Sequence, residues 1–242
     1  MIDQRVTLVT GGARRVGAAI VRSFSERGDA VVIHHGHSPE EAEALAASLR
    51  AAGTPVHVVQ ADLADALAPG RVVAEVIAAF GRLDVVVSSA SLMTRHAFDA
   101  VTPAEWDRVE AINLRAPFFL MQAAARVMTE GGVIVQMSDH LAFEATFPSL
   151  IPHQVTKSAV TQLVRAIAAA LAPRIRVNAV APGLVLAPDD LTDERLQQFL
   201  TDVPLARSGS PDDVVQAIHY LVDATYVTGT TLQVDGGRQL WR

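Results

Sequence analysis

Short apolar runs alternate along the chain with longer segments in which alanine and other apolar residues recur at helical spacing. The short runs are rich in valine and isoleucine, and most lack the polar–apolar alternation of a strand with one solvated face. Apolar strands of this kind are typical of parallel sheets that are covered on both faces. We therefore expect strands at residues 6–10, 30–34, 56–60, 83–87, 133–137, 176–180 and 231–234.

The longer segments predict helices between those strands. Three of them begin with Ser38-Pro39, Thr102-Pro103 and Ser210-Pro211, the signature of an N-cap followed by proline in the first turn. The alternation of strand and helix favours a single α/β domain over residues 1–242, with an open, doubly wound parallel sheet of about seven strands and helices on both faces. The helices are expected near residues 15–28, 39–52, 69–80, 103–128, 154–172, 192–201 and 211–223.

Composition narrows the possible functions. The chain has 242 residues, 50% of them hydrophobic, and a net charge of −6, so nothing suggests a nucleic-acid partner. No apolar run is long enough to span a bilayer, and the first residues lack the apolar core of a signal peptide. The absence of cysteine suits a reducing compartment. We therefore expect a cytoplasmic protein that acts on a small molecule and binds neither nucleic acid nor membrane.

A glycine-rich turn follows the first expected strand and opens the first expected helix. Its glycines are Gly11, Gly12 and Gly17, so the middle glycine of the usual dinucleotide-binding pattern is missing. Glycines at this position allow the backbone to approach a pyrophosphate, which the helix N-terminus then stabilises. The position favours a dinucleotide site, although an ordinary glycine-rich turn remains the alternative.

The end of the second expected strand bears on which dinucleotide binds. It reads His34-His35-Gly36-His37-Ser38, with no acidic residue to bind an adenosine ribose 2′-hydroxyl. Arg14, His37 and Ser38 could instead receive a 2′-phosphate, which favours NADPH over NADH. A metal site is the other interpretation of three close histidines, but no acid or cysteine completes a ligand set, so we expect no metal.

Lys157 is the one lysine in a chain whose other basic residues are arginines. A lysine retained against this bias indicates a site that needs a compact ammonium. The glycine-rich turn, Asp62-Leu63, Asn113, Lys157, Pro182-Gly183 and Asp235-Gly236-Gly237 occur in the order seen in short-chain dehydrogenases/reductases, and the chain resembles that family over essentially its whole length. The resemblance implies a Rossmann-type fold and an NAD(P)H-dependent oxidoreductase.

Three segments resemble the pteridine reductase and dihydromonapterin reductase branch of that family. Arg15 stands where most members have glycine, and Ser88-Ser89-Ala90-Ser91 ends in serine where most end in glycine. Asp139 stands where most members have the catalytic serine. The branch suggests a small carbonyl or a pterin-like C=N compound as substrate. Met93 lies where these reductases have an aromatic residue that stacks on the pterin, and methionine specifies a flat ring less well.

The resemblance also implies a role for each matching residue. Lys157 would hold the nicotinamide ribose, and Asn113 would anchor a water on a proton relay. The turn residues would cradle the phosphates, Arg15 would also lie near the substrate, and residues 184–205 would form a substrate lid. The residues that would line the cofactor are Gly11, Gly12, Arg14, Arg15, Val16, Gly17, His37, Ser38, Asp62, Leu63, Ser89, Ala90, Ser91, Lys157, Pro182 and Gly183.

The pattern breaks at the family's proton donor, a tyrosine four residues before the lysine, where this chain has His153. Tyr220 and Tyr226, the two tyrosines, lie too far downstream to fill that position. Three hypotheses remain open. His153 acts as the general acid, supported by Asp139 if that carboxylate lies close; or Asp139 or water protonates the substrate and His153 shapes the pocket; or catalysis is lost, and the protein binds a dinucleotide for a regulatory or structural purpose.

The helices expected at 103–128 and 154–172 resemble those that form the family's dimer interfaces. Both carry runs of three alanines, at 123–125 and at 168–170, which permit close helix approach. We therefore expect a homotetramer or a homodimer.

Overall fold

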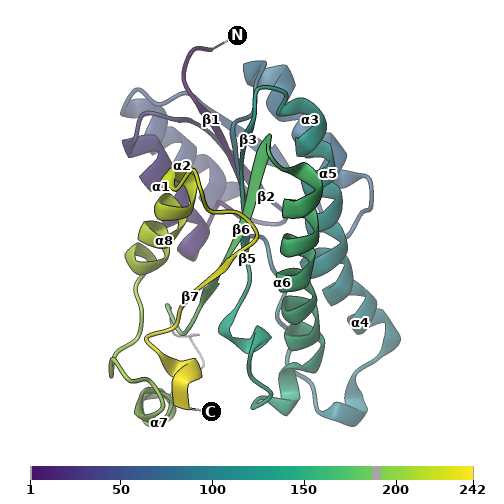
Figure 1. Cartoon of the computed structure of the whole chain (residues 1–242), viewed down its shortest axis with the longest axis vertical. Helices are drawn as coiled ribbons and strands as arrows, with labels where there is room; N and C mark the ends of the chain where they lie inside the picture. The colour runs from purple at the N-terminus through teal and green to yellow at the C-terminus, as the bar shows by residue number, and fades with distance from the viewer. Residues whose placement is uncertain (1, 187–191, 242) are drawn as a thin grey trace.

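The computed structural model describes residues 2–186 and 192–241. One sheet runs through the centre of the molecule, and all of its neighbouring strands are parallel (Figure 1). The strand order is β3-β2-β1-β4-β5-β6-β7. The strands are β1 (Val6–Thr10), β2 (Ala30–His35), β3 (Val56–Gln60), β4 (Val85–Ser88), β5 (Gly132–Met137), β6 (Ile175–Pro182) and β7 (Thr231–Val234).

Helices cover both faces of the sheet, which explains why its strands are apolar on both sides. Along β1, Val6 and Leu8 pack into the core on one face and Val9 into the core on the other. The first of these cores includes α3, α5 and α6, and the second includes α1, α2 and α8 (Figure 1). The helices are α1 (Arg15–Glu26), α2 (Pro39–Ala51), α3 (Ala68–Phe80), α4 (Pro103–Glu110), α5 (Ala116–Val127), α6 (Ile151–Leu171), α7 (Asp193–Thr201) and α8 (Pro211–Asp223).

The doubly wound fold predicted from the sequence is confirmed, with two local differences. The segment 103–128 is helical almost throughout, but a π-helical turn at Ala111–Arg115 separates α4 from α5. Such a turn inserts one extra residue into a helix and often marks a functional position. The second difference is that α6 begins at Ile151 instead of 154, because Pro152 is compatible with the first turn of a helix. His153 therefore lies inside the first turn of α6.

The topology gathers the carboxyl ends of all strands at one edge of the sheet. The strand order reverses between β1 and β4, which creates the crevice where doubly wound sheets bind ligands. In Figure 1, α7 and the C-terminal residues lie at this edge, and the N-terminus lies at the opposite end of the molecule. Among the described residues, no helix combines the length and the apolarity needed to cross a bilayer.

Candidate functional site

A cavity of about 760 Å³ lies at the carboxyl edge of the sheet. Its walls come from the glycine-rich turn, the ends of β4, β5 and β6, helix α7 and the C-terminal turn. The ionisable side chains that line it are those of Arg15, Arg95, Asp139, His140, Lys157, Asp202 and Arg238. The cavity therefore combines cationic and anionic side chains at the carboxyl edge of the sheet.

The glycine-rich turn is held in place by a buried histidine. The Gly11 amide donates to His34 Nδ1 at 3.2 Å, and His34 Nε2 donates to the Ala61 carbonyl at 3.1 Å. Burial lowers the pKa of His34 to about 4, despite the opposing effect of the hydrogen bond to Ala61. The ring is consequently neutral at pH 7, with a lone pair on Nδ1 that fixes the turn.

Backbone segments approach so closely at this turn that side chains are excluded. A Cβ on Gly17 would lie 2.0 Å from the Gly11 carbonyl oxygen, and one on Gly11 would lie 2.9 Å from the Ala90 Cα. Helix α1 begins here without a side-chain N-cap, so its first amides remain available as donors. The turn thus fits the pyrophosphate of a dinucleotide, which needs close backbone approach and free amides at a helix N-terminus.

Arg15 follows the glycine-rich turn in a backbone conformation that is unusual for a residue with a side chain. Its φ angle is 51°, in the left-handed region that favours glycine. The Arg15 guanidinium donates from Nη2 to the Leu186 carbonyl at 3.0 Å and lines the cavity beside Val16. This contact ties the glycine-rich turn to the segment that follows β6.

Residues predicted to bind the adenosine end surround the carboxyl ends of β2 and β3. His37 is exposed, and its Nε2 lies 3.9 Å from Asp62 Oδ2. Arg14 forms an exposed ion pair with Glu41 at 3.4 Å, and the Ser38 amide donates to His35 Nδ1 at 3.3 Å. Leu63 is buried beside this region. Within the described parts of the chain, no three histidine, aspartate or glutamate side chains are grouped as metal ligands.

The end of β4 is joined to the glycine-rich turn. Thr10 Oγ1 accepts hydrogen bonds from the Ser89 amide at 3.0 Å and from the Ala90 amide at 3.2 Å. Ser91 donates to Asn113 Oδ1 at 3.2 Å. Three of the residues predicted from the sequence to line the cofactor are therefore fixed at the switch point between β1 and β4.

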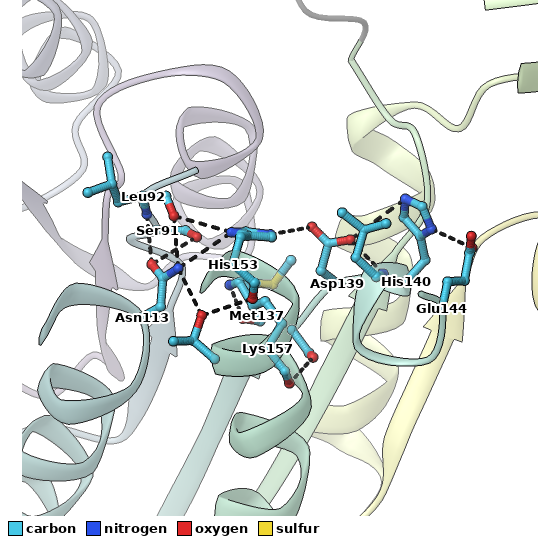
Figure 2. A network of polar contacts seen from close by, with 12 residues as sticks. Ser91, Leu92, Asn113, Met137, Asp139, His140, Glu144, His153 and Lys157 are labelled. Atoms are coloured by element: carbon cyan, nitrogen blue, oxygen red, sulfur yellow. Dashed lines mark hydrogen bonds and ion pairs between the residues drawn. The ribbon is translucent and has the colours of Figure 1, made fainter. Parts of the chain in front are cut away.

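Asn113 occupies the centre of the π-helical turn and is almost fully buried. Its Oδ1 accepts from the Leu92 amide at 2.7 Å, and its Nδ2 donates to the Leu92 carbonyl at 2.8 Å. Nδ2 also lies 3.3 Å from Thr156 Oγ1 and 3.4 Å from His153 Nδ1. Asn113 thus links the segment after β4 to the start of α6 (Figure 2).

Lys157 lies one turn after His153 on α6. Its side chain is 2% exposed, and Nζ donates to the Met137 carbonyl at 2.9 Å. Burial lowers the pKa of Lys157 to about 8, and the charge of Asp139 offsets part of that effect. Pro182 and Gly183 line the same cavity at the end of β6, where a Cβ on Gly183 would lie 2.8 Å from the Asp235 Cα.

His153 and Asp139 form a hydrogen-bonded pair. His153 Nε2 lies 3.1 Å from Asp139 Oδ2, and His153 Nδ1 lies 3.2 Å from the Leu92 carbonyl (Figure 2). A doubly protonated ring satisfies both contacts as a donor, whereas a neutral ring would accept from Asn113 at Nδ1. In either state both nitrogens face protein groups.

Of this pair, Asp139 faces the cavity. Its carboxylate is 24% exposed and lines the cavity wall, whereas His153 is 3% exposed and is not among the lining residues. Burial alone would raise the pKa of Asp139, but the hydrogen bond from His153 and the nearby His140 hold it below the ordinary value. His153 therefore supports a carboxylate that stands between it and any bound substrate.

Two further residues of the cluster, Glu144 and Arg238, escaped the sequence analysis as site residues. His140 Nδ1 lies 2.7 Å from Glu144 Oε1, which also accepts from Arg238 Nε at 2.8 Å. The contact between Glu144 and Arg238 spans 94 positions of sequence. No local spacing reveals such a contact, and the one available signal was an arginine directly after the final glycines.

Known proteins are similar to this chain over nearly its whole length. A family model described as enoyl-(acyl carrier protein) reductase matches residues 11–239. Versicolorin reductase 1 of Aspergillus parasiticus is 36% identical over 98% of this chain and 97% of its own length.

Two solved structures are also similar over nearly the whole chain. A short-chain dehydrogenase/reductase from Serratia marcescens is 33% identical, with a TM-score of 0.92 over 97% of this chain and 98% of that one. The FolM alternative dihydrofolate reductase 1 of Brucella canis, solved in complex with NADP, is 32% identical, with a TM-score of 0.92 over 99% of this chain and 96% of that one.

Proposed function

We propose that this chain, which belongs to the short-chain dehydrogenase/reductase family, is an NADPH-dependent reductase of a small carbonyl or pterin-like C=N substrate. The observation that carries the proposal is the pair formed by Asp139 and His153, placed beside Lys157 at the cavity. A reductase of this kind needs a dinucleotide site and a proton source at one sheet edge. The glycine-rich turn and Asp139 line the same cavity at that edge, which supports the proposal.

The cofactor would lie along the switch point, from the glycine-rich turn to Gly183. When bound, NADPH supplies the hydride that adds to the substrate carbon. The amides at the start of α1 would hold its phosphates, and Lys157 would bind the nicotinamide ribose. Arg14, His37 and Ser38 support a preference for NADPH over NADH, because their donors suit a 2′-phosphate and β2 ends without an acid.

The proton path follows from the order of the two residues. As the substrate heteroatom gains negative charge, Nε2 of the doubly protonated His153 ring passes a proton across the 3.1 Å contact to the Asp139 carboxylate, which delivers it to the heteroatom. The His153 ring is left neutral, with its remaining proton on Nδ1 facing the Leu92 carbonyl. His153 thus takes the place of the family's tyrosine through Asp139, without touching the substrate. Asn113 holds the His153 ring from its other side through Nδ1.

The assay for this function follows NADPH absorbance with dihydropteridines, quinones and diketones between pH 5 and 9. Asp139→Asn keeps the size of the side chain and an acceptor for the Leu141 amide, but cannot carry the proton. We expect kcat to fall by about 10²–10⁴-fold in this variant, the usual contribution of a general acid, with NADPH affinity unchanged. Unchanged kcat would refute the assignment. Saturable NADPH binding without reduction of any substrate would favour the alternative, a dinucleotide-binding protein with a regulatory or structural role.

The surface of α4 and α5 supports the proposed homotetramer or homodimer. Trp106, Phe118 and Phe119 are each exposed by more than a third on these helices. Of the alanines expected at the interface, Ala124 and Ala168 are instead buried in the core of their own chain. Light scattering at micromolar concentration should report a mass of two or four chains, and a monomeric mass would contradict the proposal.

A further inference from the structure

A buried chain of charged groups continues from Asp139 toward the C-terminus. His140 Nδ1 pairs with Glu144 at 2.7 Å, and Glu144 pairs with Arg238 at 2.8 Å. The side chains of Glu144 and Arg238 are each 2% exposed. Figure 2 shows Asp139 between His153 and His140, with Glu144 on the far side of His140.

Arg238 connects this chain to helix α7. Its guanidinium lies 4.0 Å from the centre of the Phe199 ring, and Nη1 donates to the Phe199 carbonyl at 3.4 Å and lies 3.8 Å from Asp202. A buried ion pair loses much of its Coulomb energy to desolvation, so it contributes more to position than to stability. In this protein it fixes the loop after β5 against the C-terminal turn and α7.

The fixed pair determines how His140 is oriented. Burial would raise the pKa of Glu144, but the hydrogen bonds from His140 and Arg238 lower it to about 2, so Glu144 accepts a proton-bearing Nδ1. His140 Nε2 then lies on the other side of the ring, 3.7 Å from Asp139 Oδ1. That distance is longer than a hydrogen bond, and within the described residues Nε2 makes no other polar contact.

His140 and His153 therefore differ in what their rings can reach. Both nitrogens of His153 face protein groups, and its ring lies behind Asp139. His140 lines the cavity directly, and the ring of Phe199 packs edge-on against it with centroids 5.9 Å apart. One nitrogen of His140 is thus held by protein, and the other remains available to a ligand.

We propose that His140 Nε2 binds the substrate beside the reacting group, so that the site recognises compounds with two neighbouring polar atoms. This inference rests on the proposed function, in which Asp139 serves the heteroatom that is being reduced. His140 Nε2 and Asp139 Oδ1 lie 3.7 Å apart on one wall of the cavity. They can therefore contact two adjacent heteroatoms on one edge of a substrate. Because Nδ1 carries the proton, Nε2 offers a lone pair and accepts from a donor on the substrate. α-Hydroxy ketones, and rings in which a C=N lies next to an N–H, have such an edge, whereas a simple ketone does not.

Two variants separate this role from a structural one. In His140→Asn the amide nitrogen lies where Nδ1 was and can still donate to Glu144, but nothing replaces Nε2. In His140→Gln the longer amide reaches toward the Nε2 position and can still contact a substrate. If His140 only holds the structure through Glu144, asparagine should preserve activity better than glutamine. If His140 binds the substrate through Nε2, glutamine should preserve activity better than asparagine.

The experiment measures kcat/KM for an α-hydroxy ketone and for the simple ketone of equal length, with NADPH affinity as the folding control. We expect His140→Asn to lose about tenfold more on the α-hydroxy ketone than on the simple ketone, the effect of one hydrogen bond. His140→Gln should keep most of the preference. Equal losses on both substrates, or none on either, would overturn the inference while leaving the reductase intact. Failure of the wild-type protein to oxidise NADPH with any substrate of the panel would remove the proposed function, and this inference with it.

Discussion

Replacing Lys157 with methionine should make the ligand-free protein more stable while it abolishes turnover. The ammonium is buried, and burial lowers its pKa from the ordinary 10.5 to about 8. A difference of that size corresponds to about 3 kcal/mol by which the fold disfavours the charged form at neutral pH. Methionine fills the same space without a charge. The Met137 carbonyl keeps a hydrogen bond, because Gln136 Nε2 also donates to it at 2.9 Å.

The stability difference should depend on pH in a defined direction. Between about pH 8 and pH 10.5 the unfolded chain binds more protons at Lys157 than the folded chain does, so the wild-type protein gains stability as the pH rises. Below pH 8 the lysine is charged in both states and the full difference remains. The advantage of Lys157→Met should therefore be about 3 kcal/mol at pH 7 and fade as the pH approaches 10.5.

Urea unfolding of the two ligand-free proteins, followed by far-ultraviolet circular dichroism at pH 7, 8, 9 and 10, measures this difference. The free energy of unfolding should be higher for the variant at pH 7, and the two values should converge at pH 10. A variant that is less stable than wild type at pH 7, or a gap that does not change with pH, would refute the reasoning. NADPH titration of the same samples should show weakened binding, and unchanged turnover would refute the role assigned to Lys157.

Two other predictions concern the glycine-rich turn. His34 has a pKa of about 4 in the folded protein and 6.5 as its ordinary value, so the unfolded chain binds more protons between these limits and stability falls as the pH drops through them. In His34→Gln, about 3 kcal/mol of this pH-dependent loss in the free energy of unfolding should disappear. Urea unfolding at pH 7 and pH 4.5 tests this, and a pH dependence equal to that of the wild-type protein would contradict it. Gly17→Ala should raise the NADPH dissociation constant by at least about tenfold, or about 1.4 kcal/mol, since its Cβ would lie 2.0 Å from the Gly11 carbonyl oxygen and would force the turn to move. Gly70→Ala, where a Cβ meets nothing within 4 Å, is the matched control for a fluorescence titration and should bind as wild type does.

The sequence predicted the fold because its signals are local. Valine-rich runs, proline at helix starts and the strand–helix alternation each act over a few residues, and together they leave few topologies. The sheet edge that holds the cavity follows from that topology, since parallel strands end on one side. The sequence expected Asp139 to support a charged His153 ring if the carboxylate lies close, and the two side chains lie 3.1 Å apart.

The parts that could not be predicted depend on side-chain direction and on distant partners. Spacing placed Asp139 and His153 in one site, but could not tell which of them faces the cavity. The pair of Glu144 and Arg238 joins a loop after β5 to the C-terminal turn, and neither residue has a local pattern that points to the other. The π-helical turn around Asn113 has no sequence signature within an otherwise regular helical stretch.

The burial of Lys157 also limits which reagents can modify the side chains of the folded protein. The chain has no other lysine and no cysteine, so its one side-chain amine is enclosed and it offers no thiol. Amine-directed acylating reagents and thiol-directed alkylating reagents therefore find no exposed lysine or cysteine on the folded surface. Acylation of Lys157 becomes possible when the core around α6 opens. The rate of Lys157 acylation therefore measures how often this core opens, without an engineered label.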